Sequence, residues 1–285
     1  MKTRHITIKD AEYPNLLKEI PTAPQRLWLL GAKLNNDEKR LTVVGTRKPT
    51  FYGKKVLDKL VKEVASAGVT IVSGLAIGTD CLAHQAALNA GGKTIAILPG
   101  GLDNIYPPGN RKLAQRILDS GGTLISEYPE NTPTFAWNFV ARNRIQSGIS
   151  EAVLIIEAAE KSGTLITADF AIEQNRTLMA IPGNIDSLVS IGTNQLIKEG
   201  ATPVTCAQDI LEALGVNIKA AKVAEYKPEN QTEKNILNLI RSGTSQSEEI
   251  QVKSKLDAVE YSTALTMLEI KGVISQSAPG VWDIK

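Results

Sequence analysis

The region from Leu41 to Gly101 contains three short runs of β-branched and aliphatic residues, and each run ends in a turn of small residues. The runs are LTVV, VTIVS and TIAIL, and stretches with a helical spacing of apolar residues separate them. Alternation of buried strands with amphipathic helices is typical of βα units that build a parallel sheet. Because ligands bind beyond the carboxyl ends of such strands, the pattern predicts a doubly wound α/β domain with a binding site at that edge.

The alternation of strand and helix continues to about residue 215, without a fixed repeat length. We therefore expect an extended Rossmann-like, mostly parallel sheet in residues 41–215, preceded by a short N-terminal lead-in over residues 1–40. Residues 216–231 have clustered charge and few apolar positions, and we interpret them as a linker. Residues 232–285 contain three helical patterns followed by two short strand patterns around Pro279-Gly280. That order is typical of a winged-helix domain.

Composition narrows the class of protein. The formal net charge is only +2, so an anion-binding site must come from local clusters of basic residues. The sequence has no apolar stretch near the roughly 20 residues of a membrane span, and its first residues lack the apolar core of a signal peptide. Cys81 and Cys206 are too few for a disulfide framework. We expect a cytoplasmic protein with no membrane partner.

Sequence motifs of catalysis are scarce. No GxGxxG opens the first helix, and the sequence Gly91-Gly92-Lys93-Thr94 lacks the leading glycine of a P-loop because position 87 is alanine. His5 and His84 are isolated, and no His/Cys/Asp spacing fits a metal site. We therefore expect no catalytic residues, no metal and no cofactor, and we predict that the protein is not an enzyme.

Three of the turns after predicted strands have the small residues that let backbone N–H groups approach an anion. They are Gly45-Thr46-Arg47, the glycine-bounded turn Gly74–Gly78, and Ser162-Gly163-Thr164, and each precedes a predicted helix. A helix N-terminus adds partial positive charge behind such a turn. One turn of this kind often reflects turn geometry alone, but several at one edge favour a ligand that carries phosphate.

Basic residues lie beside aromatic residues at two places in the sequence. Arg47 and Lys48 precede Phe51, and Arg142 and Arg144 follow Phe139. Cations that follow a phosphate backbone, together with rings on which bases stack, are what single-strand binding requires. The alternative is that most of these rings pack in the core. Carboxylates that end strands, Asp80, Glu127 and Glu157, are interpreted as helix caps or as partners of Arg142 or Arg144.

Eight sequence blocks, in this order, resemble the DNA-processing protein A family, which is also called DprA or Smf. The blocks are VGTRKPTFYG, VSGLAIGTDCLAHQAAL, ILPGGLDNIYPPGN, SEYP, FVARNRIQSGIS, SGTLITADFAIEQNR, AIPGNI and SIGTNQLIKEGA. The resemblance implies a homodimer that binds single-stranded DNA, protects incoming strands and loads the RecA recombinase during natural transformation. It also implies a DNA-binding site formed by Gly45, Thr46, Arg47, Lys48, Gly74, Asn110, Phe139, Arg142, Asn143, Arg144, Ser162, Gly163 and Thr164.

The sequence departs from the family pattern in two respects. Val140 occupies a position where the FxARNR motif is expected to have proline, and only about 40 residues precede the first expected strand, whereas many relatives have a longer helical domain there. The predicted last helix of the tail carries Asp257, Glu260 and Glu269 against Lys271. Such a helix suits the major groove poorly, and we expect the tail to have a protein-contact role or an accessory role.

Two other functions remain open from sequence alone. Rossmann-like sheets with PGG turns include nucleotide phosphoribohydrolases, but their PGGxGTxxE motif is absent because Pro99-Gly100-Gly101 continues as LDNI. A regulator that binds duplex DNA through the winged-helix tail is the second alternative. Turnover of AMP derivatives would support the hydrolase, and footprinting by residues 232–285 would support the regulator.

Overall fold

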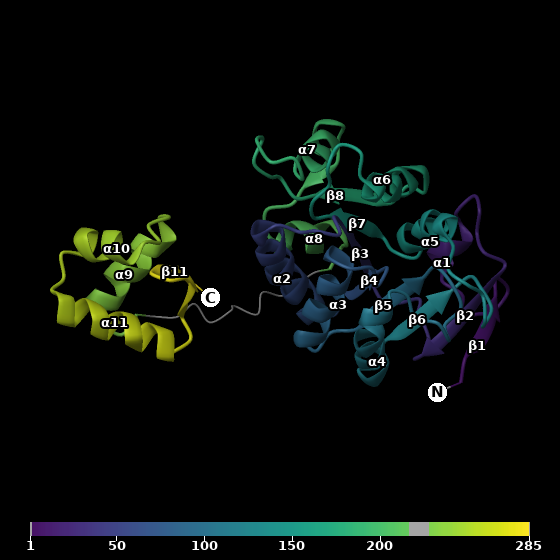
Figure 1. Cartoon of the computed structure of the whole chain (residues 1–285), viewed down its shortest axis with the longest axis horizontal. Helices are drawn as coiled ribbons and strands as arrows, with labels where there is room; N and C mark the ends of the chain where they lie inside the picture. The colour runs from purple at the N-terminus through teal and green to yellow at the C-terminus, as the bar shows by residue number, and fades with distance from the viewer. Residues whose placement is uncertain (1, 217–227, 285) are drawn as a thin grey trace. The chain divides into compact units, whose positions relative to one another are not determined.

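The protein is described by a computed structural model that covers residues 2–216 and 228–284 (Figure 1). The chain divides into two compact units, a main unit of Met1–Ile218 and a C-terminal unit of Lys219–Lys285. The linker expected over residues 216–231 falls mostly on residues 217–227, which lie outside the described residues.

A nine-stranded sheet runs through the main unit in the order β1-β2-β6-β5-β4-β3-β7-β8-β9. All neighbours from β6 to β9 pair in parallel, which confirms the predicted extended Rossmann-like architecture. The strands are β1 (Arg4–Thr7), β2 (Arg26–Gly31), β3 (Arg40–Val44), β4 (Thr70–Ser73), β5 (Thr94–Leu98), β6 (Thr123–Ser126), β7 (Ala152–Ile155), β8 (Thr177–Ala180) and β9 (Thr202–Pro203).

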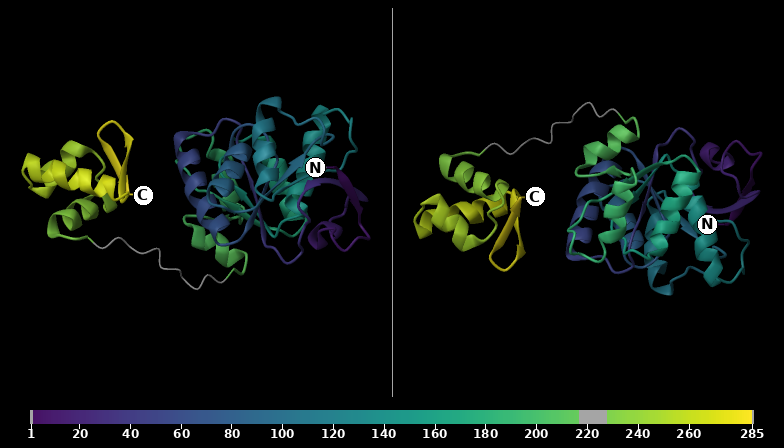
Figure 2. Two further views of the ribbon diagram at one scale, coloured as in Figure 1. Left: turned by 90° about the horizontal axis from the view of Figure 1, so that it is seen from below. Right: turned by 90° about the horizontal axis from the view of Figure 1, so that it is seen from above.

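Helices cover both faces of this sheet (Figures 1 and 2). Side chains of a strand alternate between the faces, so Val43 packs in the core with α2, α3 and α8, whereas Val44 packs in the core with α6 and α7. The helices are α1 (Asn15–Lys18), α2 (Phe51–Ser66), α3 (Thr79–Asn89), α4 (Arg111–Asp119), α5 (Ala136–Gly148), α6 (Gly163–Glu173), α7 (Ile191–Lys198) and α8 (Ala207–Ala213), with a short 3-10 turn at Pro108–Asn110.

The N-terminal residues belong to the sheet. β1 pairs with β2, and β2 pairs with β6, both antiparallel, so two strands that the sequence did not predict extend the sheet at this edge. Tyr13 is fully buried between them and α1, and its hydroxyl donates to the Pro24 carbonyl oxygen at 2.6 Å. At the opposite edge, β9 consists of only two residues and pairs with β8.

The C-terminal unit has three helices followed by a two-stranded antiparallel hairpin, the element order expected of a winged helix. Its own apolar core includes Ile236, Leu268 and Trp282. Lys271, which follows the last helix, is ion-paired with Glu229 at 2.7 Å and Glu233 at 2.8 Å. The elements are α9 (Gln231–Arg241), α10 (Ser247–Ser254), α11 (Ala258–Ile270), β10 (Ile274–Ala278) and β11 (Val281–Ile284).

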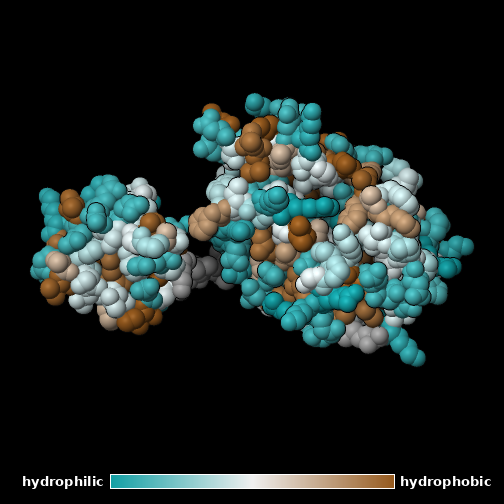
Figure 3. Space-filling view, viewed as in Figure 1, coloured by the Kyte–Doolittle hydropathy of each residue, from teal (hydrophilic) through white to brown (hydrophobic). Residues whose placement is uncertain are grey.

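Apolar side chains also reach the surface of the main unit. In the loop before α7, Ile185 and Leu188 are 87% and 75% exposed. Figure 3 shows apolar surface in the neighbourhood of α7. Across the described part of the chain, no helix combines the length and the apolar character needed to cross a lipid bilayer.

Candidate functional site

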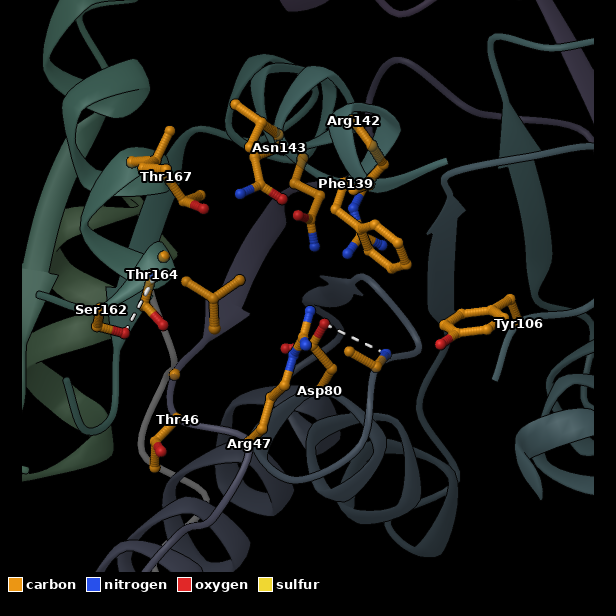
Figure 4. Close-up of a pocket in the computed structure, with 18 residues that line it drawn as sticks. Thr46, Arg47, Asp80, Tyr106, Phe139, Arg142, Asn143, Ser162, Thr164 and Thr167 are labelled. Carbon is orange, nitrogen blue, oxygen red and sulfur yellow. Dashed lines mark hydrogen bonds between the residues drawn. The ribbon is translucent and has the colours of Figure 1, made fainter. Parts of the chain in front are cut away.

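A cavity of about 650 Å³ opens where the strand order of the sheet reverses. β3 lies between β4 and β7, and the chain builds outward from β3 to β6 before it returns to the other side of β3 as β7. Ligands of open α/β sheets bind beyond the carboxyl ends of the strands at this position. The cavity lies between the turn after β3, helix α5 and the beginning of α6 (Figure 4). We call it the switch pocket.

The structure brings most of the residues expected at the site into this pocket. Figure 4 shows Arg47 and Phe139 reaching into it from opposite sides, with Ser162 and Thr164 on another wall. Among the residues that line the switch pocket are Gly45, Thr46, Arg47, Phe139, Arg142, Asn143, Ser162, Gly163 and Thr164.

The turn after β3 is fixed by close packing against α3. Thr79 donates to the Thr46 carbonyl oxygen through its backbone N–H at 3.2 Å and through its hydroxyl at 2.9 Å. A Cβ at Gly45 would lie 2.7 Å from the Thr79 hydroxyl oxygen, and one at Gly78 would lie 2.6 Å from the Cα of Arg47. Gly78 also has φ 82°, a conformation that favours glycine. The glycines therefore allow the contact that holds the backbone of Arg47 in place.

The Arg47 side chain is exposed and lies against an aromatic ring. Its guanidinium carbon is 5.7 Å from the centroid of the Phe139 ring. Phe139 in turn meets Tyr106 edge-on, with centroids 5.6 Å apart. Within residues 2–216 and 228–284, Arg47 forms no ion pair with a carboxylate. Its charge is therefore available to a ligand in the switch pocket.

Arg142 forms the floor of the pocket. It is only 5% exposed, and its Nη1 donates to the carbonyl oxygen of Gly74 at 2.5 Å and to that of Ile97. Burial lowers the pKa of Arg142 to about 10, so the side chain stays charged at neutral pH. Asp80 lies nearby and accepts from the backbone N–H of Gly74 at 3.1 Å. Burial raises the pKa of Asp80, and the charge of Arg142 opposes that shift.

Arg144 lies outside the lining of the switch pocket, which corrects its expected place there. Its guanidinium forms an ion pair with Glu127 at 2.6 Å, the pairing with a strand-end carboxylate that the sequence analysis had favoured. The physical reason is helical geometry, because residues two apart on a helix face different directions. Since α5 carries Arg142 into the pocket, it turns Arg144 toward the end of β6.

Three further expected residues also lie outside the lining. Lys48 is exposed, and its backbone N–H donates to the Thr46 hydroxyl oxygen at 3.2 Å. Gly74 lies beneath Arg142, where a Cβ would overlap the guanidinium group. Asn110 donates its side-chain amide to the Leu75 carbonyl oxygen at 2.8 Å. Gly74 and Asn110 thus shape the turn after β4 and do not contribute to the wall.

The N-terminus of α6 forms a further wall of the pocket. Ser162 caps this helix, and its hydroxyl oxygen accepts from the Thr164 backbone N–H at 3.2 Å. A Cβ at Gly163 would have no atom within 4 Å, so the backbone is open to a ligand there. The backbone N–H of Gly163 and the helix dipole favour an anion at this position.

Sequence reasoning missed several pocket residues, among them Tyr106, Gln146 and Thr167. Gln146 is 1% exposed, and its side-chain nitrogen has no hydrogen-bond partner among the described residues. It lies four positions after Arg142 on the same helix, so recognition of α5 as a helix would have predicted its place in the pocket. Tyr106 belongs to the block ILPGGLDNIYPPGN, which resembles the family but gives this tyrosine no predicted role.

The comparisons with known proteins agree with this architecture. The sequence model of the family described as DNA recombination-mediator protein A matches residues 4–215. DNA processing protein DprA of Bacillus subtilis is 42% identical over 210 residues, which are 73% of this chain and 70% of that protein.

Two solved structures of relatives superpose on about three quarters of this chain. The X-ray structure of DprA from Streptococcus pneumoniae has a TM-score of 0.69 at 40% identity and covers 74% of each chain. The structure of Helicobacter pylori DNA processing protein A, described in terms of its single-stranded DNA binding mode, has a TM-score of 0.65 at 31% identity. It covers 74% of this chain and 95% of that one.

Proposed function

Because the chain belongs to the DNA recombination-mediator protein A family, we propose that it binds single-stranded DNA in the switch pocket and holds the strand without altering it. The observation that carries this proposal is the position of Arg47, an exposed cation beside an aromatic ring at the switch point of the sheet. The single-stranded DNA binding mode described for the Helicobacter pylori relative supports it.

The chemistry of the pocket suits an unpaired strand. Arg47 and the backbone N–H of Gly163 provide contacts for phosphate oxygens from two sides. Phe139 provides an aromatic face on which a base stacks, and every base has such a face, so the binding tolerates sequence. A duplex keeps its bases stacked on one another, and we therefore expect single strands to bind more tightly than double strands.

The proposal includes the role that the family resemblance implies. The protein protects incoming single strands in the cytoplasm and loads RecA onto them during natural transformation. RecA-dependent strand exchange, measured with and without this protein, tests the loading step. An increased rate supports the loading step, and an unchanged rate counts against it.

We further propose that the protein is a homodimer. The exposed side chains Ile185 and Leu188 before α7 provide an apolar surface of the kind that marks protein interfaces. Sedimentation velocity of wild type and of Leu188→Glu tests this assignment. We expect a dimer for wild type and a monomer for the variant, and a monomeric wild type would contradict the proposal.

The main experiment is a fluorescence anisotropy titration with labelled oligo-dT of about 20 nucleotides, longer than one binding site. The control is a duplex of equal length. We expect the single strand to bind at least about tenfold more tightly, a difference of about 1.4 kcal/mol. Its affinity should fall with salt, with a slope near −0.7 for each phosphate contacted. Equal affinity for both DNAs, or a flat salt response, would refute the proposed function.

A further inference from the structure

An exposed aromatic pair lies at the beginning of α5. The rings of Phe135 and Trp137 are stacked, with centroids 4.5 Å apart and planes only 8° from parallel. The side chains are 43% and 65% exposed, and neither belongs to the lining of the switch pocket. Two large rings held parallel at the surface form a preformed apolar platform, which we call the aromatic platform.

The platform is held in place by the turn after β5. The Asn138 side chain donates to the Pro99 carbonyl oxygen at 2.7 Å, and the backbone N–H of Gly101 donates to the Thr132 carbonyl oxygen at 3.0 Å. A Cβ at Gly100 would lie 2.5 Å from the Thr134 hydroxyl oxygen, so glycine is required for this approach. The Pro99-Gly100-Gly101 motif thus anchors the loop that carries the platform.

The aromatic platform adjoins the switch pocket on the same helix. Ala136 lines the pocket and lies between the two platform residues in sequence, and the lining residues Phe139 and Val140 follow them. Phe135 is the N-cap residue of α5, so the platform lies at the beginning of the helix that carries Phe139 into the pocket. A strand that stacks a base on Phe139 therefore passes beside the platform.

We propose that the Phe135–Trp137 stack binds a second base of the strand held in the switch pocket, an inference that rests on the proposed function. Residues 131–141 include no charged side chain, so the platform offers no partner for phosphate. Stacking on an aromatic side chain contributes to single-strand affinity without releasing counterions. The platform therefore adds affinity that is independent of salt, whereas Arg47 adds affinity that depends on it.

Tryptophan fluorescence reports on the platform directly. The chain has three tryptophans; Trp282 is buried, Trp28 is half-buried, and Trp137 is 65% exposed. Oligo-dT should quench the emission of wild type by stacking a base on Trp137. Trp137→Phe should abolish the quenching, because Trp282 is buried and Trp28 is half-buried, while the variant preserves an aromatic ring for binding.

The affinity measurement uses Trp137→Leu with Trp137→Phe as its matched control. We expect the leucine variant to lose about 5- to 150-fold in affinity for oligo-dT, the range for one stacked base. The phenylalanine variant should stay within about threefold of wild type, since it preserves a ring for the stack. The slope of affinity against salt should be the same in all three proteins. Arg47→Ala, measured in parallel, should lower that slope by about 0.7.

Each outcome has a defined meaning. The platform would be overturned if oligo-dT did not quench the emission of wild type and if Trp137→Leu bound like wild type. A lower salt slope of Arg47→Ala would then still support DNA binding in the switch pocket. Equal losses for the leucine and phenylalanine variants would also overturn it, because stacking would then not be the cause. Absence of single-strand binding by wild type would overturn both the proposed function and the platform.

Discussion

The guanidinium carbon of Arg47 lies 5.7 Å from the centroid of the Phe139 ring, although one residue follows β3 and the other lies in α5. A cation at this distance from an aromatic face is attracted by the ring, which holds the side chain ready to bind. The two groups provide different contacts, since one is suited to a phosphate and the other to a base. Their proximity is the basis of the first prediction.

Replacement of Arg47 by alanine should weaken binding of oligo-dT by about 1–3 kcal/mol, because a charge-assisted contact with phosphate is lost. Lys48→Ala is the matched control, since Lys48 is also exposed but lies outside the pocket lining. Anisotropy titrations at one salt concentration compare the two. Equal losses would show that general charge, not the position of Arg47, determines affinity.

Arg144→Gln should lower the free energy of unfolding by about 1–3 kcal/mol, because the half-buried carboxylate of Glu127 loses its charged partner. Its effect on oligo-dT affinity should be smaller than that of Arg47→Ala. Lys62→Gln breaks an exposed pair with Asp58 and should cost less than about 1 kcal/mol. Urea denaturation measures stability, and a large binding defect in a stable Arg144 variant would contradict the structural role.

Gly74→Ala should destabilise the main unit by about 1–3 kcal/mol, because the new methyl group overlaps the buried guanidinium of Arg142. The control is Gly109→Ala, where a Cβ would meet no atom within 4 Å and where the effect should stay within about 1 kcal/mol. Thermal unfolding of both variants gives the comparison. Equal melting temperatures would mean that Arg142 moves aside freely.

Stability should depend on pH through His84, which is fully buried and whose Nδ1 lies 2.6 Å from the Thr94 hydroxyl oxygen. Burial lowers the pKa of His84 from 6.5 to about 3, and the charge of Arg142 adds to that shift. Between these values the unfolded chain binds a proton that the folded chain excludes. The contribution of neutral His84 to the free energy of unfolding is therefore complete above pH 6.5 and is lost as the pH falls toward 3.

The free energy of unfolding should change through His84 by no more than about 1.4 kcal/mol for each pH unit, which is the energy of one pKa unit. Urea denaturation of wild type and His84→Gln at pH 7, 6 and 5 isolates it, because other titrating groups, Asp80 included, are present in both proteins. We expect the stability difference between the two proteins to shift in favour of the glutamine variant as the pH falls. Parallel curves would exclude a neutral buried His84.

Strand-and-helix alternation predicted the centre of the main unit well, because buried strands and amphipathic helices follow the simple periods of apolar residues. Helix α2 begins at Phe51, because Thr50 caps it and Glu157 accepts from the Thr50 backbone N–H at 2.9 Å. The cap involves a residue far away in sequence, which local patterning does not reveal. The strands β1 and β2 were missed because their pairing with β6 is likewise long-range.

The sequence pattern did not predict helix α5, for a different physical reason. Its buried face carries the polar residues Asn138, Arg142 and Gln146 at a spacing of four, while Trp137 and Val140 are exposed. This reverses the usual distribution of apolar residues on a surface helix. The inverted pattern occurs where the helix lines the switch pocket, so local rules failed at the candidate functional site itself, as they often do.

The two-residue strand β9 determines how the sheet ends beyond β8. Pro203 has no backbone N–H, and proline on an outermost strand removes a hydrogen bond that a further strand would need. Another polypeptide is thereby discouraged from continuing the ladder at this border. Pro203 therefore protects this border against the edge-to-edge strand pairing by which exposed sheets aggregate.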